Sequence, residues 1–150
     1  MTQIVCLILE GASSQAVQDA AIAQARQPHM KLTFLHVVDV KGLGLTSELL
    51  LAVAERELTW LGRTSLNLAQ KRAYTQGVTA AATIRFGSFF PTIQQFLREH
   101  QTEYLFIGKP RPDMPHYEER LEKFNQLVQT LTSTLRLEVY AVANEEKAVR

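Results

Sequence analysis

Short apolar runs alternate along the chain with longer stretches in which apolar residues recur every three or four positions. The short runs predict five strands, at residues 4–9, 32–38, 78–86, 104–107 and 137–143. The stretches between them have the period of amphipathic helices, so they predict four helices. Strands and helices that alternate in this way form a parallel sheet with helices on both faces. The expected fold is therefore an α/β sandwich around a five-stranded parallel sheet.

Two of the predicted helices have apolar faces that we expect to pack on the sheet. In the first helix, the expected face consists of Ala16, Ala20 and Ala23. In the long helix that ends near Gln76, the expected face consists of Leu50, Ala54, Leu58, Leu61, Ser65 and Leu68. Leu51 and Val53 lie off that face. They either form an apolar patch for a partner or cover more of the sheet.

The composition fits one globular domain. The chain has 150 residues, of which 46% are hydrophobic and 21% charged, and its formal net charge is +1. These values exclude a disordered chain and a coiled coil, and the balanced charge gives no indication of a nucleic-acid partner. We expect a single domain over residues 1–150, with an ordered core at about 3–143 and a charged tail at 144–150.

The sequence also predicts the compartment. Its single cysteine, Cys6, cannot form an internal disulfide, which is compatible with a reducing environment. No stretch approaches the 18 or so consecutive apolar residues of a membrane span, and the N-terminus lacks a basic leader. We therefore expect a cytoplasmic protein without membrane insertion.

Parallel sheets of this kind hold ligands beyond the carboxyl ends of their strands. The loops to examine are therefore those at residues 10–12, 39–44 and 108–115. Two carboxylates end strands there, Glu10 and Asp39, and a close pair of carboxylates binds magnesium or shifts the pKa of each partner. The alternative is that they cap helices or face water.

The remaining polar and aromatic residues give no pattern of a metal centre or a catalytic nucleophile. The four histidines are scattered and show no metal-ligand spacing, so no metal site is expected. His116 opens the last helix beside the crevice, where it is a candidate ligand contact. No serine lies in a nucleophile-elbow pattern, so no catalytic residue is assigned. Trp60, on the long helix, is expected to be packed or partly exposed, because no basic patch accompanies it.

Four segments together resemble the universal stress protein family. They are residues 5–13, 32–39 (with Leu-His-Val-Val at 35–38), 86–88 and 104–108, in matching order and spacing. The resemblance implies a Rossmann-like fold of the adenine nucleotide alpha hydrolase kind, with the sheet order 3-2-1-4-5. It also implies a homodimer joined along the fifth strands. One branch of the family binds ATP and another does not.

The ATP-binding branch carries a motif after the fourth strand: glycine, two residues, glycine, nine residues, glycine, then serine or threonine. Here Gly108 matches the first glycine, but Arg111 stands at the second, Leu121 at the third and Glu122 at the hydroxyl position. The motif is therefore degenerate in this chain. Lys109 and Arg111 are nevertheless able to supply positive charge to an anion.

The loop itself also disfavours a phosphate. Pro110, Pro112 and Pro115 each lack an N–H, so they make a poor cradle for an anion. Glu118 and Glu119, in the first turn of the last helix, already complement its positive end. No cofactor is therefore expected, with ATP or AMP and magnesium as the alternative. The candidate nucleotide- or anion-binding residues are Glu10, Gly11, Val38, Asp39, Gly108, Lys109, Arg111 and His116.

The last strand predicts self-association. Leu137 and Val139 point to one side of it, and Tyr140 and Val142 point to the other. An edge strand with so little protection tends to be paired or covered. Pairing with a second copy across a two-fold axis removes the edge, so these four residues are the expected dimer strand.

Three functions follow as hypotheses. The first is a non-catalytic binding or signalling module that acts as a homodimer without standard ATP binding. The second is an ATP- or AMP-binding, slowly hydrolysing protein with a phosphate loop rebuilt around Glu10, Lys109 and Arg111. The third is a regulatory partner of a transporter or kinase, as the family resemblance implies.

Overall fold

The structure is a computed structural model that describes residues 1–9 and 15–143. Its elements are, in chain order, β1 (Thr2–Leu7), α1 (Gln15–Ala25), β2 (Met30–Val38), the short 3₁₀ helix η1 (Lys41–Leu43), α2 (Glu48–Thr75), β3 (Ala81–Phe86), α3 (Phe89–Glu99), β4 (Tyr104–Lys109), α4 (Tyr117–Leu135) and β5 (Glu138–Ala143). The five predicted strands and four predicted helices are all present.

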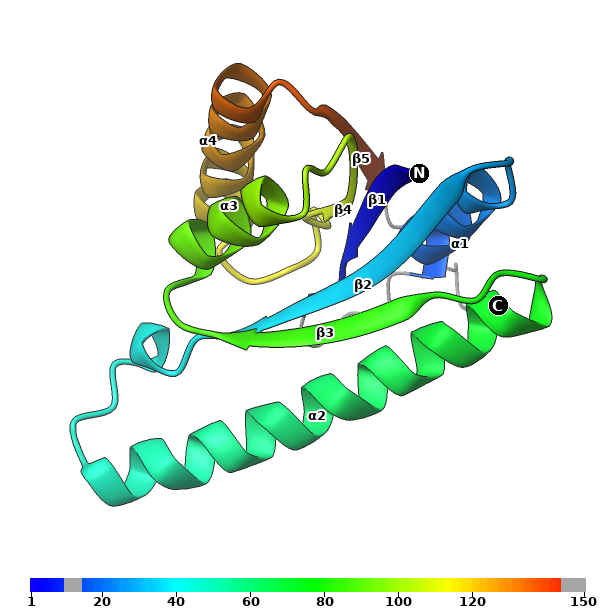
Figure 1. The fold of residues 1–150 in the computed structure, drawn as a ribbon. Helices are drawn as coiled ribbons and strands as arrows, with labels where there is room; N and C mark the ends of the chain where they lie inside the picture. Colours follow the sequence, from blue (N-terminus) through cyan, green and yellow to red (C-terminus); the bar gives the residue numbers. More distant parts are fainter. Residues whose placement is uncertain (10–14, 144–150) are drawn as a thin grey trace.

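The strands form one parallel sheet in the order β3-β2-β1-β4-β5. The predicted fold class and strand order are therefore confirmed. β1 lies at the centre, where Ile4 pairs with Leu32 of β2 on one side and with Tyr104 of β4 on the other. Helices α1 and α2 cover one face of the sheet, and α3 and α4 cover the other (Figure 1).

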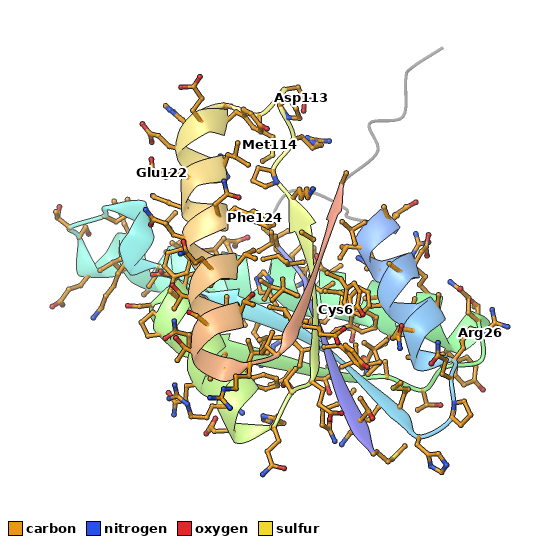
Figure 2. All side chains as sticks on the ribbon, turned by 90° about the horizontal axis from the view of Figure 1, so that it is seen from above. Cys6, Arg26, Asp113, Met114, Glu122 and Phe124 are labelled. Carbon is orange, nitrogen blue, oxygen red and sulfur yellow. The ribbon has the colours of Figure 1, made fainter. Side chains whose placement is uncertain are left out.

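Alternating residues of the central strands fill two separate cores. On β1, Ile4 and Cys6 face the helices α1 and α2, whereas Val5 and Leu7 face α3 and α4. Cys6 lies deep in the interior (Figure 2), and burial raises the pKa of its thiol, so the thiol stays protonated. A strand buried on both faces explains why β1 is a continuous apolar run.

The predicted sheet-facing side of α2 is wrong. Leu50, Leu61 and Leu68 are exposed, whereas the buried residues of the helix are Gly62, Leu66, Ala69 and Ala73. The small residues let the helix approach the sheet closely: a Cβ on Gly62 would lie 2.4 Å from Cδ2 of His36 on β2. Leu66 is the one large side chain on this face, and the helix turns Leu50, Leu61 and Leu68 away from the sheet.

On α1 the buried face also differs from the sequence prediction. The buried face of α1 consists of Val17, Ala21, Ile22 and Ala25, and Ala23 is exposed. On α2, Leu51 is half-buried, and Val53 and Trp60 are exposed. Among the described residues, no helix is both long and apolar enough to cross a membrane.

Candidate functional site

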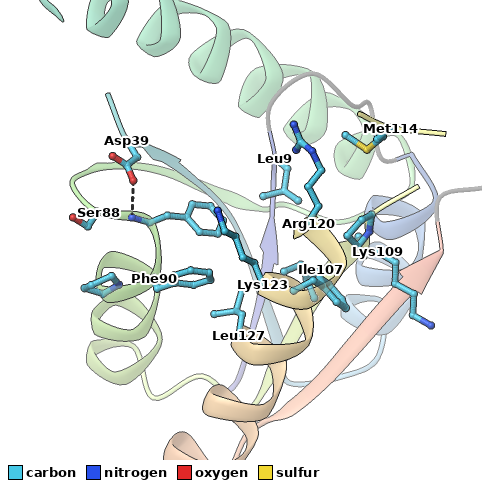
Figure 3. Close-up of a pocket in the computed structure, with 15 residues that line it drawn as sticks. Leu9, Asp39, Ser88, Phe90, Ile107, Lys109, Met114, Arg120, Lys123 and Leu127 are labelled. Atoms are coloured by element: carbon cyan, nitrogen blue, oxygen red, sulfur yellow. Dashed lines mark hydrogen bonds between the residues drawn. The ribbon is translucent and has the colours of Figure 1, made fainter. Parts of the chain in front are cut away.

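A cavity of about 520 Å³ lies between α3 and α4, at the carboxyl ends of the central strands (Figure 3). Its volume is in the range of small-molecule sites in proteins. It is lined by Leu9, Asp39, Ser88, Phe89, Phe90, Pro91, Ile107, Gly108, Lys109, Pro110, Met114, Arg120, Lys123, Phe124 and Leu127. The crevice expected from the strand order therefore exists, and it opens on the α3 and α4 side of the sheet.

Most of the cavity wall is apolar. Phe89 and Phe90 open α3 and lie edge to face, with ring centroids 5.5 Å apart and planes at 73°. Ile107 on β4 and Leu127 on α4 are buried beside them, and Phe124 is half-buried. The helical spacing of Phe124 and Leu127 turns both toward the sheet, whereas Glu122 points away from it (Figure 2). Such a wall suits a flat, apolar part of a ligand.

The charge on the lining is mainly positive. Arg120 and Lys123 lie on the first turns of α4, and Lys109 ends β4. Nε of Arg120 donates to the carbonyl of Pro115 at 3.0 Å, which holds that side chain near the loop. Figure 3 shows Lys123 extending from α4 toward the α3 side, whereas Lys109 points away from the cavity. A rim of this kind attracts an anion.

Asp39 is the single acidic residue among the described lining residues, and its two oxygens accept backbone hydrogen bonds. Oδ1 accepts from the N–H of Gly42 at 3.1 Å, and Oδ2 accepts from the N–H of Phe89 at 3.1 Å. The second bond satisfies a donor at the N-terminus of α3, where negative charge is favourable. This geometry favours the capping role over the carboxylate pair. Glu10 and Gly11 lie outside the described residues.

The remaining candidates from the fourth-strand loop are distributed unevenly. Gly108 is buried and lines the cavity beside Lys109. Arg111 is not among the lining residues, and its Nε lies 3.5 Å from Oδ1 of Asp113. His116 is exposed, has a left-handed backbone (φ 56°) directly before α4, and also lies off the lining. Of the predicted loop at 108–115, Gly108, Lys109, Pro110 and Met114 therefore line the cavity, whereas Arg111 does not.

Val38 is buried at the end of β2, and its carbonyl accepts the N–H of Gly87 at 3.1 Å. The bond joins the ends of β2 and β3 beside Asp39. Within residues 1–9 and 15–143, no three side chains of His, Cys, Asp or Glu come together as a metal site would require.

The sequence prediction missed the residues that α3 and α4 contribute. Phe90, Lys123 and Phe124 all line the cavity, and none was a candidate. One signal was present in the sequence: Leu121, Phe124, Val128 and Leu131 recur at helical spacing, and Lys123 stands beside Phe124. A helix that follows a strand of such a sheet begins at the crevice, so its first turns belong to the search.

The predicted dimer strand is an edge of the sheet, paired with β4 on one side only. Leu137 is buried just before β5, and Val139 packs into the α3 and α4 core. Tyr140 and Val142 lie on the other face, where the Tyr140 ring stacks on Phe106 with centroids 4.8 Å apart. The Tyr140 hydroxyl donates to the Glu138 carboxylate at 2.7 Å, which raises the pKa of Tyr140.

Comparison with known sequences identifies the class of protein. The model of the Universal stress protein family matches residues 1–124. The chain therefore belongs to the universal stress protein family. No curated protein matches the sequence significantly.

Solved structures confirm the fold. The universal stress protein UspA from Lactobacillus plantarum has a TM-score of 0.74 at 18% identity, with 94% of this chain and 97% of that chain covered. The universal stress protein from Archaeoglobus fulgidus in complex with dAMP has a TM-score of 0.65 at 14% identity, with 95% and 98% covered. A family protein from Arabidopsis thaliana with AMP bound has a TM-score of 0.61 at 12% identity, with 100% and 97% covered.

Proposed function

We propose that the protein is a non-catalytic binding module of the universal stress type. In this proposal it acts in the cytoplasm as a homodimer, and its cavity takes a small amphipathic anion rather than ATP in the standard manner. One observation carries the proposal: an apolar, aromatic wall faces a positively charged rim in the cavity between α3 and α4. Ligand binding would change contacts with a regulatory protein partner.

The ligand chemistry follows from the two halves of the cavity. The rings of Phe89, Phe90 and Phe124 favour a flat apolar group. Lys123 and Arg120 favour one anionic group near the first turns of α4. Both oxygens of Asp39 already accept backbone N–H groups, so the carboxylate is engaged away from Lys123 and Arg120. The two cations therefore remain available to a ligand anion.

Three features speak against standard ATP binding. The loop after β4 contains Pro110, Pro112 and Pro115, which have no N–H to offer a phosphate. Arg111 is close to Asp113 and away from the cavity. The first turn of α4 carries Glu118 and Glu119, which would repel a chain of phosphates.

A nucleoside monophosphate is the second candidate ligand. Three similar structures are described as complexes with dAMP, AMP and cAMP. Each of these molecules combines a flat base with one phosphate, which is the chemistry proposed for this cavity. ATP with magnesium, and slow hydrolysis, remain the alternative function.

Thermal unfolding with and without 1 mM ligand tests the choice. A ligand with a Kd of about 10 µM adds about 2.7 kcal/mol at that concentration. For a chain of this size the melting temperature then rises by about 5–10 °C. We expect such a rise with AMP or with anilinonaphthalene sulfonate, an aromatic anion, and none with ATP and magnesium. An equal rise with ATP and magnesium would overturn the proposal.

Two charge substitutions locate the ligand. Lys123→Gln removes a rim cation and should weaken binding of the sulfonate at least about tenfold, because a hydrogen bond to a charged group is lost. Lys71→Gln removes an exposed cation from α2 and should leave binding unchanged. Equal affinities of the two variants would place the ligand elsewhere.

The homodimer is proposed to form along β5. The N–H of Glu138 donates to the Glu103 carbonyl at 2.9 Å. Strand alternation therefore turns the amides of Val139 and Ala141 toward the open edge. Ala141→Pro removes an outward donor without removing a bond to β4. We expect Ala141→Pro to halve the molar mass measured by light scattering. Ala143→Pro is a second test, because the amide of Ala143 is the next one along β5 that points toward the open edge. An unchanged mass in both variants would refute this interface.

A further inference from the structure

The N-terminal half of α2 carries large apolar side chains that the fold does not cover. Within residues 48–61 no side chain is buried, and these turns extend past the carboxyl ends of β2 and β3 (Figure 1). Leu50, Trp60 and Leu61 are 52%, 62% and 50% exposed, and Leu68, about two turns further along the helix, is 63% exposed. Exposed apolar residues that gather on one helix mark an interaction surface more often than a solvated one.

The spacing of these residues indicates what covers them. Along one side of α2 the positions advance in steps of four and three residues, and we name this side the seam: Leu50, Ala54, Glu57, Leu61, Thr64 and Leu68. This is the repeat by which one helix packs along another helix. Val53 and Trp60 lie beside the seam and widen it. The seam is separate from the face that packs on the sheet, which includes Gly62 and Leu66.

The seam is complementary to itself. When two copies of α2 lie antiparallel across a two-fold axis centred near Thr59, Leu50 of one copy faces Leu68 of the other. Ala54 then faces Thr64, and Glu57 faces Leu61. The layers near the ends contain two leucines each, whereas each inner layer pairs one apolar side chain with one polar side chain. A two-fold contact needs only this one surface.

Charge and space favour the antiparallel arrangement. A parallel pair would place Glu57 directly against Glu57 of the other copy, whereas the antiparallel pair separates the two carboxylates along the helix. The antiparallel pair also places the body of each copy beside the projecting half of α2 in the other. At the C-terminal end of α2, a guanidinium nitrogen of Arg72 lies 3.3 Å from Oδ1 of Asp19 on α1. Helix α1 therefore already occupies the space beside that end.

Other occupants fit less well. The tail at residues 144–150 is mostly polar or charged, with two apolar side chains, so its composition does not match a seam of leucines. A membrane surface would favour cations along the margins of the apolar side, whereas Arg56, Glu55 and Glu57 on these turns are of mixed sign. Self-complementarity along the whole seam is specific to a second copy of this chain.

We infer that α2 pairs with α2 of a second copy in an antiparallel two-fold contact along the seam. The contact is distinct from the β5 edge and does not depend on a ligand. Glu57 is the single charged residue of the seam. Its position between the leucine layers weakens the contact and fixes its register, as a polar residue does in a paired-helix core.

Disulfide trapping tests the register directly. Leu50→Cys protein mixed with Leu68→Cys protein should give covalent dimers under mild oxidation, because the two positions face each other. Each variant alone should not, because its two cysteines lie about 27 Å apart in the antiparallel pair. Native Cys6 is buried, so it does not contribute. Leu49→Cys mixed with Leu68→Cys is the matched control, because Leu49 is turned about 100° from Leu50.

The outcomes of trapping are decisive. Cross-linking in the Leu50→Cys and Leu68→Cys mixture above the Leu49→Cys control supports the seam. Cross-linking within each variant alone would show a parallel pair and would overturn the inference. The absence of cross-linking in all samples at a protein concentration of about 100 µM would also overturn it.

Sedimentation equilibrium measures the strength of the contact in the Ala141→Pro background, in which the β5 edge is blocked. Leu61→Glu should raise the dissociation constant at least about tenfold, because a leucine leaves the apolar contact. Glu57→Gln should lower it about threefold, whereas Glu55→Gln should leave it unchanged. Unaltered self-association in Leu61→Glu would refute the inference. A membrane-bound monomer would also refute it: in that case the Ala141→Pro protein would float with phosphatidylglycerol vesicles as a monomer, and adding Leu61→Glu would abolish the flotation.

Discussion

The two faces of the sheet use their helices differently. On one face, α3 and α4 diverge at the carboxyl ends of the strands and enclose a cavity, with the large apolar residues of α4 directed inward. On the other face, α2 lies close on β2 through Gly62, Leu66, Ala69 and Ala73, and it directs Leu50, Leu61 and Leu68 outward. Both helices are amphipathic in sequence. They differ in which of their apolar residues pack against the sheet.

The difference shows that the size of the residues at the contact decides the role of the surface. A helix that meets the sheet through leucine and phenylalanine stands off from it, which leaves room for a cavity between neighbouring helices. A helix that meets the sheet mainly through glycine and alanine, as α2 does with Leu66 as the one larger buried residue, leaves no such room. Its larger apolar residues then remain for contacts outside the domain.

The same substitution on the two faces should give the largest contrast. Leu131→Ala removes a fully buried side chain of α4 and should cost about 3 kcal/mol in the free energy of unfolding. Leu68→Ala removes an exposed side chain of α2 and should cost less than about 1 kcal/mol in the monomer. Urea denaturation at low protein concentration measures both. Equal losses would show that the seam is part of the folded core.

The close approach of α2 is tested by Gly62→Ala. In an exposed helix this change is stabilising by about 1 kcal/mol. Here the new Cβ would meet the buried His36 ring at 2.4 Å, so we expect a net loss of about 1–2 kcal/mol. Thermal unfolding gives the sign. A gain in stability would mean that the helix can rise from the sheet without cost.

Asp39 connects the two faces, because it bonds the loop that leads to α2 and the first turn of α3. Asp39→Ala removes both bonds and should cost about 1 kcal/mol, which is typical of a lost helix cap. Asp39→Asn keeps one acceptor and should cost less. If Asp39→Ala left the unfolding midpoint unchanged, the capping role would be refuted.

The smallest effect concerns Cys6 on the α1 and α2 face. Burial raises the pKa of this thiol above its ordinary value of 9.0. Below pH 9 the thiol is protonated in both the folded and the unfolded chain. Above pH 9 it ionises only in the unfolded chain, so the folded state loses stability as pH rises, by about 1 kcal/mol at pH 9.5.

Cys6→Ala should remove the part of the decrease in unfolding free energy at high pH that comes from this thiol. Comparing the unfolding of both proteins at pH 8 and pH 9.5 measures that part. The same loss in both proteins would assign the effect to other groups. Slow labelling of Cys6 by iodoacetamide in the folded protein is the expected companion result.

The sequence predicted the fold well because the strands are recognisable without knowledge of their neighbours. Each is a short apolar run, and β1 and β2 are apolar on both sides because both faces are covered. The face of α2 was not predictable in the same way. Its leucines and its small residues both recur at helical spacing, and the choice between them depends on the contact of Gly62 with His36 on another element.

The candidate site was predicted in part. Asp39, Gly108 and Lys109 follow from the rule that ligands bind beyond the strand ends, and all three line the cavity. Phe90 and Lys123 did not follow, because their place depends on how far α3 and α4 diverge. That distance is set by packing between side chains distant in sequence.

The central position of β1 has a consequence for synthesis of the chain. Among the strands of this sheet, β1 is synthesised first and pairs with β2 early, but its other neighbour arrives about 100 residues later, since Ile4 pairs with Tyr104. Until then one edge of an apolar strand has no partner, and nascent chains in this condition aggregate readily. The sheet can close only when most of the chain has emerged, so slow release or a bound chaperone would raise the yield of folded protein.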